Sequence, residues 1–193
     1  MALVGFCGSR SLSSSFAGLV GSVVRSVLAF GRSVAVGCAA GGDLLVRSAA
    51  PGARVFRVSS FAGGGGPPRA AFVRRSVALV RAVAASGAGA GFVGFVAVGC
   101  PRSVAPSASP SRCFCGGGSG SWASLALAAG LGVPVVVFRC GSVSVPGFPA
   151  CPLGLSLPSW WGGSWAPAAA SGPWSGGFRW SPPAGSAVQG ALF

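Results

Sequence analysis

A loop rich in glycine and serine, Gly116 to Ser121, stands directly before an apolar segment with helical spacing, Trp122 to Ala129. Glycine lets the backbone approach a ligand closely. The first turn of a helix offers unpaired N–H groups and the positive end of the helix dipole to an anion. The loop therefore predicts a phosphate-binding site. The residues expected to contact the ligand are Gly117, Gly118, Ser119, Gly120 and Ser121.

Other charged residues could serve the same anion. We expect Arg10, which follows Gly8 and Ser9, to reach it, because guanidinium groups form charge-assisted hydrogen bonds with phosphates. Arg75 is expected either to reach the anion or to fix the loop. Asp43 is the single carboxylate side chain of the sequence, and two roles are possible for it. It either caps the helix that follows it or accepts a hydrogen bond from the ligand.

The sequence offers few groups for catalysis. General acid–base chemistry needs a titratable side chain within reach of the substrate, and the chain contains neither Glu nor His. Its seven cysteines include no Cys-x-x-Cys pair, and without His a zinc site would depend on thiolates almost alone. We therefore expect small buried cysteines in a reducing cytoplasm, and predict no catalytic residue, metal ion or cofactor.

The chain is strongly basic, with a net charge of +13 that comes entirely from arginine. Such a charge favours nucleic acids and other anions as partners. The absent residue types, however, share codons with adenine at the first or second position: Ile, Lys, Asn, Thr, Tyr, His and Glu. A gene depleted of adenine encodes arginine as its one unrestricted charged residue. The basic charge is thus either a binding device or a by-product of the codon bias.

Apolar strands alternate with amphipathic helical segments in the first 140 residues. The strands are expected at Ala2–Phe6, Ser33–Val36, Arg54–Val58, Gly91–Val98 and Val133–Phe138, and the helices at Phe16–Phe30, Leu44–Ala50, Pro68–Ala85 and Trp122–Ala129. Nearly continuous apolar strands in alternation with helices are typical of a parallel sheet covered on both faces. We therefore predict an α/β fold, doubly wound and Rossmann-like, with five parallel strands in the order 3-2-1-4-5.

This strand order places a switch point between the first and fourth strands, where ligands bind in such sheets. Residues 1–140 are expected to form the ligand-binding domain. Residues 141–193 are rich in Gly, Pro and Ser and hold five of the six tryptophans. Proline and glycine oppose long regular elements, so this C-terminal extension is predicted to be irregular coil and turns. It is expected either to wrap its own domain or to dock on a second copy, since exposed indoles would form apolar patches.

Two long uncharged runs, Ala82 to Pro101 and Cys113 to Phe138, have the length of a membrane span. Glycine and serine interrupt both, and each divides into shorter helix and strand patterns. The N-terminus has no basic region before its apolar residues, and Arg10 follows closely, which is unlike a signal peptide. The expectation is a cytoplasmic protein without a membrane partner.

Four motifs in order resemble those of the SLOG superfamily, the Rossmann-like group that joins DNA-processing protein A to the Lonely Guy phosphoribohydrolases. Gly8-Ser9-Arg10 resembles the group's Gly-Ser-Arg, and the segment 37–43 resembles its Gly-x-Ala-x-Gly-x-Asp turn. Arg75-Ser76 resembles an Arg-Asn pair with Ser in place of Asn. The segment 117–121 resembles Gly-Gly-x-Gly-Thr with Ser121 in place of Thr. The resemblance covers roughly residues 2 to 140.

The resemblance implies a nucleotide or nucleotide-derived anion as ligand, in a binding or sensing role. Lonely Guy enzymes carry a Glu shortly after the glycine motif, but Trp122-Ala123-Ser124 follows it here. Whether the chain is an enzyme therefore stays open. Single-stranded DNA binding, as in DNA-processing protein A, is one alternative, with arginines on phosphates and tail tryptophans stacked on bases. Weak hydrolysis of nucleoside monophosphates is another. High apolar content and the tryptophan-rich extension predict a homo-oligomer.

Overall fold

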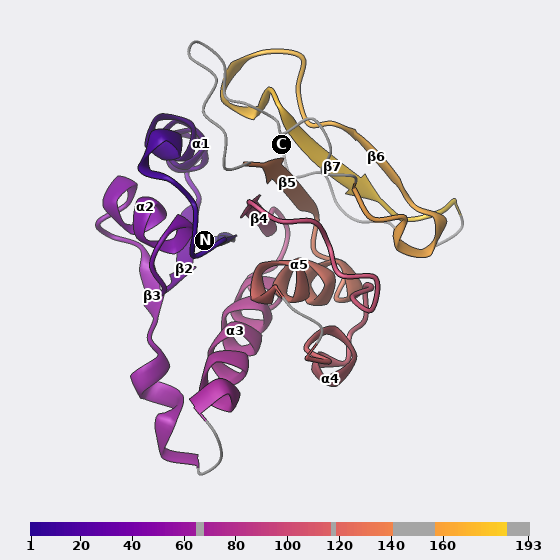
Figure 1. Cartoon of the computed structure of the whole chain (residues 1–193). Helices are drawn as coiled ribbons and strands as arrows, with labels where there is room; N and C mark the ends of the chain where they lie inside the picture. Colours follow the sequence, from indigo (N-terminus) through magenta and orange to yellow (C-terminus); the bar gives the residue numbers. More distant parts are fainter. Residues whose placement is uncertain (65–67, 117–118, 141–156, 185–193) are drawn as a thin grey trace.

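A computed structural model describes residues 1–64, 68–116, 119–140 and 157–184 of the chain. One mixed, mostly parallel sheet of seven strands runs through it in the order β3-β2-β1-β4-β5-β7-β6. Helices cover both faces of this sheet (Figure 1). The fold is therefore α/β, as predicted, although the predicted sheet was smaller.

Five parallel strands form the first part of the sheet. They are β1 (Leu3–Gly8), β2 (Ser33–Gly37), β3 (Arg54–Phe56), β4 (Gly91–Val96) and β5 (Val135–Arg139). Their order, β3-β2-β1-β4-β5, is the predicted one. The central strands are buried along almost their whole length, which explains their continuous apolar sequence.

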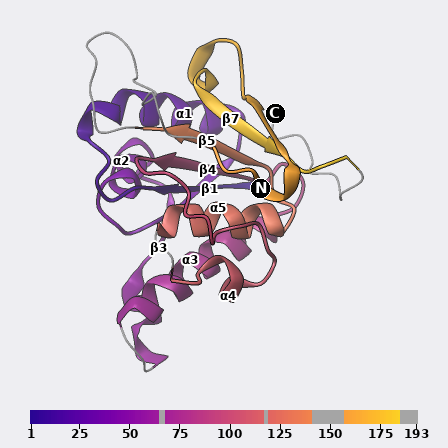
Figure 2. The ribbon, with the colours of Figure 1, turned by 45° about the vertical axis from the view of Figure 1, so that its right-hand side comes forward.

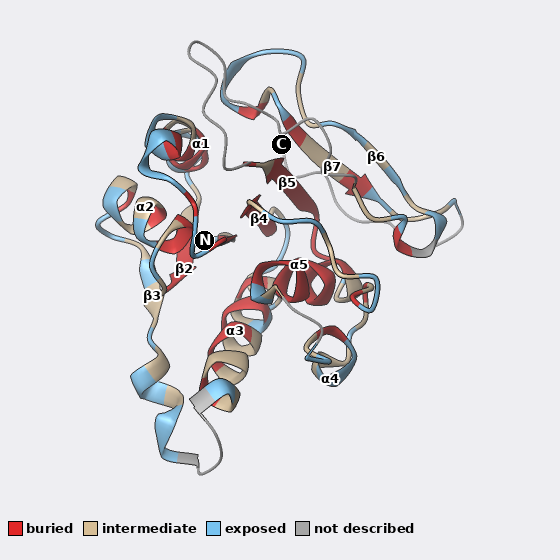
Figure 3. Cartoon of the chain, viewed as in Figure 1, coloured by how far each residue is buried: buried red, intermediate tan, exposed pale blue. Residues whose placement is uncertain are grey.

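The helices divide between the two faces of the sheet (Figure 2). On one face lie α1 (Ala17–Ala29), after a 3₁₀ turn at Ser14–Phe16, and α2 (Gly42–Ala49). On the other lie α3 (Pro68–Ala84), α5 (Gly120–Gly130) and the short α4 (Pro110–Cys113), which is not among the predicted helices. Ser121 to Ala129 of α5 are all buried (Figure 3). Two apolar clusters result, one on each face.

The C-terminal extension corrects the sequence prediction. Instead of coil and turns alone, it adds a hairpin of β6 (Ser164–Pro167) and β7 (Gly177–Ser181). Strand β7 pairs antiparallel with β5, and β6 pairs antiparallel with β7 (Figure 1). The five-stranded, all-parallel sheet is therefore wrong for the whole molecule. Proline is tolerated because it ends an edge strand, at Pro167.

The extension packs on its own domain. Trp174, in a 3₁₀ turn at Gly172–Trp174, is 7% exposed and donates from its indole N–H to the Ser26 hydroxyl of α1 at 3.1 Å. Trp160, in the turn Trp160–Gly162, and Trp180 of β7 are buried as well. The first expectation for the extension, wrapping its own domain, is therefore met in the part that the structure describes. Self-association stays a prediction.

No helix in the described part of the chain is long and apolar enough to cross a membrane. The run from Ala82 to Pro101 divides between the end of α3 and strand β4, and the run from Cys113 to Phe138 contains α5 and β5. Both long uncharged runs thus resolve into the shorter elements that their glycines and serines predicted.

Candidate functional site

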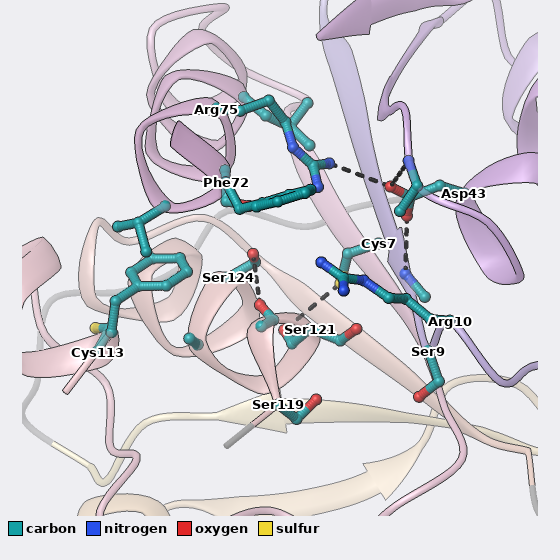
Figure 4. Close-up of a pocket in the computed structure, with 18 of the residues that line it drawn as sticks. Cys7, Ser9, Arg10, Asp43, Phe72, Arg75, Cys113, Ser119, Ser121 and Ser124 are labelled. Atoms are coloured by element: carbon teal, nitrogen blue, oxygen red, sulfur yellow. Dashed lines mark hydrogen bonds and ion pairs between the residues drawn. The ribbon is translucent and has the colours of Figure 1, made fainter. Parts of the chain in front are cut away.

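A pocket of about 680 Å³ opens at the carboxyl edge of the parallel strands (Figure 4). The end of β1, Ala39 after β2 and Asp43 of α2 form one side. The inner face of α3, the first turn of α5 and the segment 98–116 form the rest. This is the crevice that the strand order predicted as the ligand site. The residues predicted from sequence that line it are Gly8, Ser9, Arg10, Asp43, Arg75, Ser119, Gly120 and Ser121. Gly117 and Gly118 lie outside the described residues.

Glycines bring the end of β1 and the start of α2 into direct contact. A Cβ on Gly8 would lie 2.6 Å from the Cα of Gly42, and a Cβ on Gly42 would lie equally close to Gly8. Gly41 has φ of +66°, which disfavours other residues, and its neighbour Gly42 donates to the Ser9 carbonyl at 3.0 Å. The glycine-rich turn predicted at 37–43 therefore serves first to place α2 against the sheet.

Asp43 and Arg75 form a buried ion pair at the floor of the pocket. Asp43 is 4% exposed and Arg75 is 7% exposed, and the Arg75 Nη1 lies 3.1 Å from the Asp43 Oδ2. The Asp43 carboxylate also accepts from the backbone N–H groups of Gly8 and Ala39, each at 3.2 Å. All of these partners are donors, which suits an ionised carboxylate.

The environment of this carboxylate contains opposing influences. Burial raises the pKa of Asp43 above its usual value, whereas the Arg75 guanidinium and the two backbone donors act to lower it. A Cβ on Gly37 would collide with both side chains, so the ion pair fills the space above that glycine. The pair thus joins β1, β2, α2 and α3 at one point.

This geometry changes the reading of Asp43. Helix α2 begins at Gly42, with Gly41 as its N-cap residue and no side-chain cap hydrogen bond, so Asp43 lies inside the first turn. The capping hypothesis is therefore wrong. The Asp43 carboxylate instead bonds to the strand end and to Arg75, and both side chains line the pocket.

Arg10 is an exposed arginine that lines the pocket. Its guanidinium carbon lies 4.8 Å from the centre of the Phe72 ring on α3, a cation–π distance. Figure 4 shows its side chain reaching into the pocket between Arg75 and the serines of α5. Ser9 beside it is fixed, because its N–H donates to the Phe95 carbonyl at 2.9 Å and its hydroxyl accepts from the Ala97 N–H at 2.9 Å. The backbone from which the Arg10 side chain extends is therefore held in place by the hydrogen bonds of Ser9.

Helix α5 points its N-terminus at the same space. Ser119 is its N-cap residue and makes no side-chain cap hydrogen bond, and Gly120 and Ser121 form the first turn beside the pocket. The Ser124 hydroxyl turns back to the Gly120 carbonyl at 2.8 Å. The N–H groups of a first turn have no partner within the helix and favour an anion.

Several pocket residues were missed by the sequence reasoning. Arg69, Phe72 and Leu79 lie with Arg75 on one face of α3, at helical spacing, and line the pocket. Arg69 donates to the Gly116 carbonyl at 3.1 Å and so connects α3 to the glycine loop. That spacing was a usable signal. The apolar lining from Val98, Val104 and Phe114 had no comparable signal, because it comes from an irregular segment.

Two thiols line the pocket, Cys7 on β1 and Cys113 at the end of α4. Burial raises the pKa of Cys7 well above its ordinary value, and the nearby Asp43 carboxylate raises it further. Burial also raises the pKa of Cys113 to about 11. Neither is a thiolate nucleophile at neutral pH. In the described ranges, no three Cys or Asp side chains cluster closely enough to hold a metal ion.

Comparison with known proteins found no matching family model, no matching curated protein and no matching solved structure. The function must therefore be argued from the site itself.

Proposed function

We propose that the protein binds a nucleotide, or another small organic anion derived from one, in the pocket at the carboxyl edge of β1 and β4. The observation that carries this proposal is the balance of charge in the pocket. Three arginines line it, against a single carboxylate that is already paired with one of them. The first turn of α5 adds N–H groups that have no partner within the helix.

The pocket has two chemically different halves. Arg10, Ser119 and Ser121 lie around the polar half, where an anionic group would accept hydrogen bonds from guanidinium, hydroxyl and backbone donors. Phe114, with Val98 and Val104, lies in the apolar half, which suits a base or another planar group, and the Phe72 ring that Arg10 contacts lies beside the polar groups. A volume of about 680 Å³ is within the usual range for small-molecule sites.

The role proposed is binding or sensing rather than catalysis. The chain has no Glu or His, the buried thiols are held neutral, and the Asp43 carboxylate is engaged by Arg75 and two backbone donors. A group that performs acid–base catalysis must be able to exchange a proton with the substrate. The SLOG-like motifs are consistent with this proposal, since each of the four supplies at least one pocket residue.

Single-stranded DNA binding finds less support. Trp160, Trp174 and Trp180 are at most 7% exposed, so their rings are not available for stacking on bases in this conformation. Trp165, which is half-buried, packs against Trp160. The arginines alone would give only salt-dependent attraction to phosphates.

Calorimetric titration tests the proposal, with AMP, ADP-ribose, NAD, adenosine and pyrophosphate as ligands at two salt concentrations. We expect saturable one-to-one binding of at least one nucleotide, weak binding of adenosine, and only a modest effect of salt. Binding that scales with phosphate charge alone and disappears in high salt would contradict the proposal. So would the absence of binding across the panel. Release of free adenine from AMP would show the hydrolytic alternative.

A further inference from the structure

Two tryptophans hold the apolar wall of the pocket. The indole N–H of Trp122, in the first turn of α5, donates to the Val98 carbonyl at 2.8 Å. The indole N–H of Trp160 donates to the Val104 carbonyl at 3.0 Å. Both valines line the pocket, and Val104 is 4% exposed. Two indole N–H groups therefore hold the backbone of the segment between β4 and α4, which forms the apolar wall of the pocket.

One of these indoles comes from the C-terminal extension. Trp160 is 3% exposed, and its ring lies 5.8 Å from Trp122 in an edge-to-face arrangement. It also lies 5.5 Å from Trp165 on β6 and 5.9 Å from Trp180 on β7. These four tryptophans, the tryptophan cluster, connect the hairpin on one side to the pocket wall and the start of α5 on the other.

We propose that docking of the β6–β7 hairpin regulates the pocket, with Trp160 as the positioning residue that transmits it. When the hairpin is docked, Trp160 fixes the Val104 wall at the distance from Phe72 and Arg10 that the ligand requires. When it is released, the Val104 carbonyl loses its strongest donor, because the Cys100 thiol, at 3.8 Å, is a weak substitute. This inference rests on the proposed function, since it concerns affinity at the same site.

Coupling of this kind acts in both directions. If hairpin docking strengthens ligand binding, then ligand binding must strengthen hairpin docking by the same factor. A hairpin that only covered the edge of β5 would stabilise the fold. Its own stability would then not change when a ligand binds in the pocket. Reciprocity therefore distinguishes regulation from simple stabilisation.

Trp160→Phe and Trp165→Phe form a matched pair for the test. Each removes one indole N–H from the same cluster and keeps an aromatic ring. Trp165 donates to the Pro158 carbonyl at 2.9 Å, within the extension, whereas Trp160 donates to the pocket wall. With AMP as the probe, we expect W160F to bind about three- to tenfold more weakly than wild type, the range of one lost buried hydrogen bond. W165F should stay within about twofold.

Hydrogen exchange gives the second readout, and it needs no ligand. In W160F, the N–H groups of Val104 and Ser107, which bond to Pro101 and Ala126 in the wild type, should exchange several-fold faster. In W165F they should not. In wild type, saturating AMP should slow exchange in residues 164–181, and this arm does not depend on the folding of either variant.

The outcomes separate the two proposals. If wild type binds AMP but W160F and W165F behave alike, and AMP leaves the hairpin unchanged, the coupling is overturned while the ligand site stands. If wild type binds nothing in the panel, the proposed function fails. The exchange of Val104 and Ser107 then decides whether Trp160 holds the wall at all, and equal exchange in both variants would overturn that as well.

Discussion

The two sides of the pocket are built in different ways. The polar side, at the end of β1, is held by backbone contact between Gly8 and Gly42 and by the Asp43–Arg75 ion pair. The apolar side, the segment from Val98 to Phe114, is irregular apart from the single turn of α4 and depends on tryptophans for its position. The polar side is assembled from short motifs at 8–10, 37–43 and 75–76. The apolar side is held by tryptophans that lie 24 and 56 residues along the chain from the carbonyl groups they bond to. The comparison shows why short motifs revealed one half of the site and not the other.

Removing the cation of the ion pair is expected to have the largest effect on stability. Arg75→Met leaves the Asp43 carboxylate buried without its partner, at a cost of about 3–5 kcal/mol in the free energy of unfolding. Chemical denaturation followed by circular dichroism measures this cost. Arg74→Met is the matched control on the same helix, because Arg74 is half-buried and its guanidinium donates to the Phe61 carbonyl rather than to a carboxylate. Equal losses in the two variants would show that the pair does not organise the polar side.

A substitution in the β6–β7 hairpin should destabilise the hairpin locally rather than unfold the whole domain. Trp180 is 2% exposed and packs on Trp160, so Trp180→Ala is expected to cost about 3 kcal/mol. The loss should concentrate in the hairpin, because the parallel strands keep their own helices on both faces. Hydrogen exchange should therefore rise across residues 164–181 and little in β1 or β4. A uniform rise through the whole sheet would contradict this division of the molecule.

Alkylation rates compare buried cysteines on the two sides of the pocket with an exposed cysteine nearby. Cys7 and Cys113 are buried, one on each side, and Cys115 is exposed. Because the thiolate is the reactive form, a pKa of about 11 for Cys113 lowers its reactive fraction at pH 8 about 100-fold relative to its ordinary value. Of these three thiols, we expect Cys115 to be alkylated first, and Cys7 and Cys113 much more slowly because they are buried and their pKa values are raised. Mass spectrometry of digested protein identifies the sites, and rapid labelling of Cys7 would mean that the pocket floor is open.

The parallel part of the sheet was predictable from the sequence because its strands are short apolar runs separated by glycine-rich turns. The hairpin was not predicted, because Gly, Pro and Ser dominate its composition. A weak signal was present: in Gly177-Phe178-Arg179-Trp180-Ser181, aromatic residues alternate with non-aromatic ones, as in a strand with two different faces. Its pairing with β5 could not be inferred, since that depends on which edge of the sheet is left open.

The sequence predicted where the pocket lies but only some of the residues that line it. Strand order located the crevice, and the motifs supplied Arg10, Asp43 and Arg75. The partner of Asp43 could not be deduced from local sequence, because Arg75 lies 32 residues further along the chain. Its capping role was wrong for the same reason: a strand end and a distant guanidinium outcompeted the local helix terminus for its oxygens. Phe114 and Val104 could not be predicted as lining residues because irregular segments show no periodic pattern in the sequence.

We propose that the pocket selects an anionic ligand through specific contacts rather than through overall charge. The variants Arg10→Ala and Arg25→Ala separate these two possibilities. Both variants lose one exposed arginine and carry the same net charge, but Arg10 lines the pocket whereas Arg25 lies on α1, where it bonds to Ser22. In a calorimetric titration with AMP, we predict that Arg10→Ala weakens binding by about 1.5–3 kcal/mol, the value of a charge-assisted hydrogen bond. Arg25→Ala should leave it unchanged. Equal affinity of the two variants would contradict the claim and attribute any binding to the basic character of the whole protein.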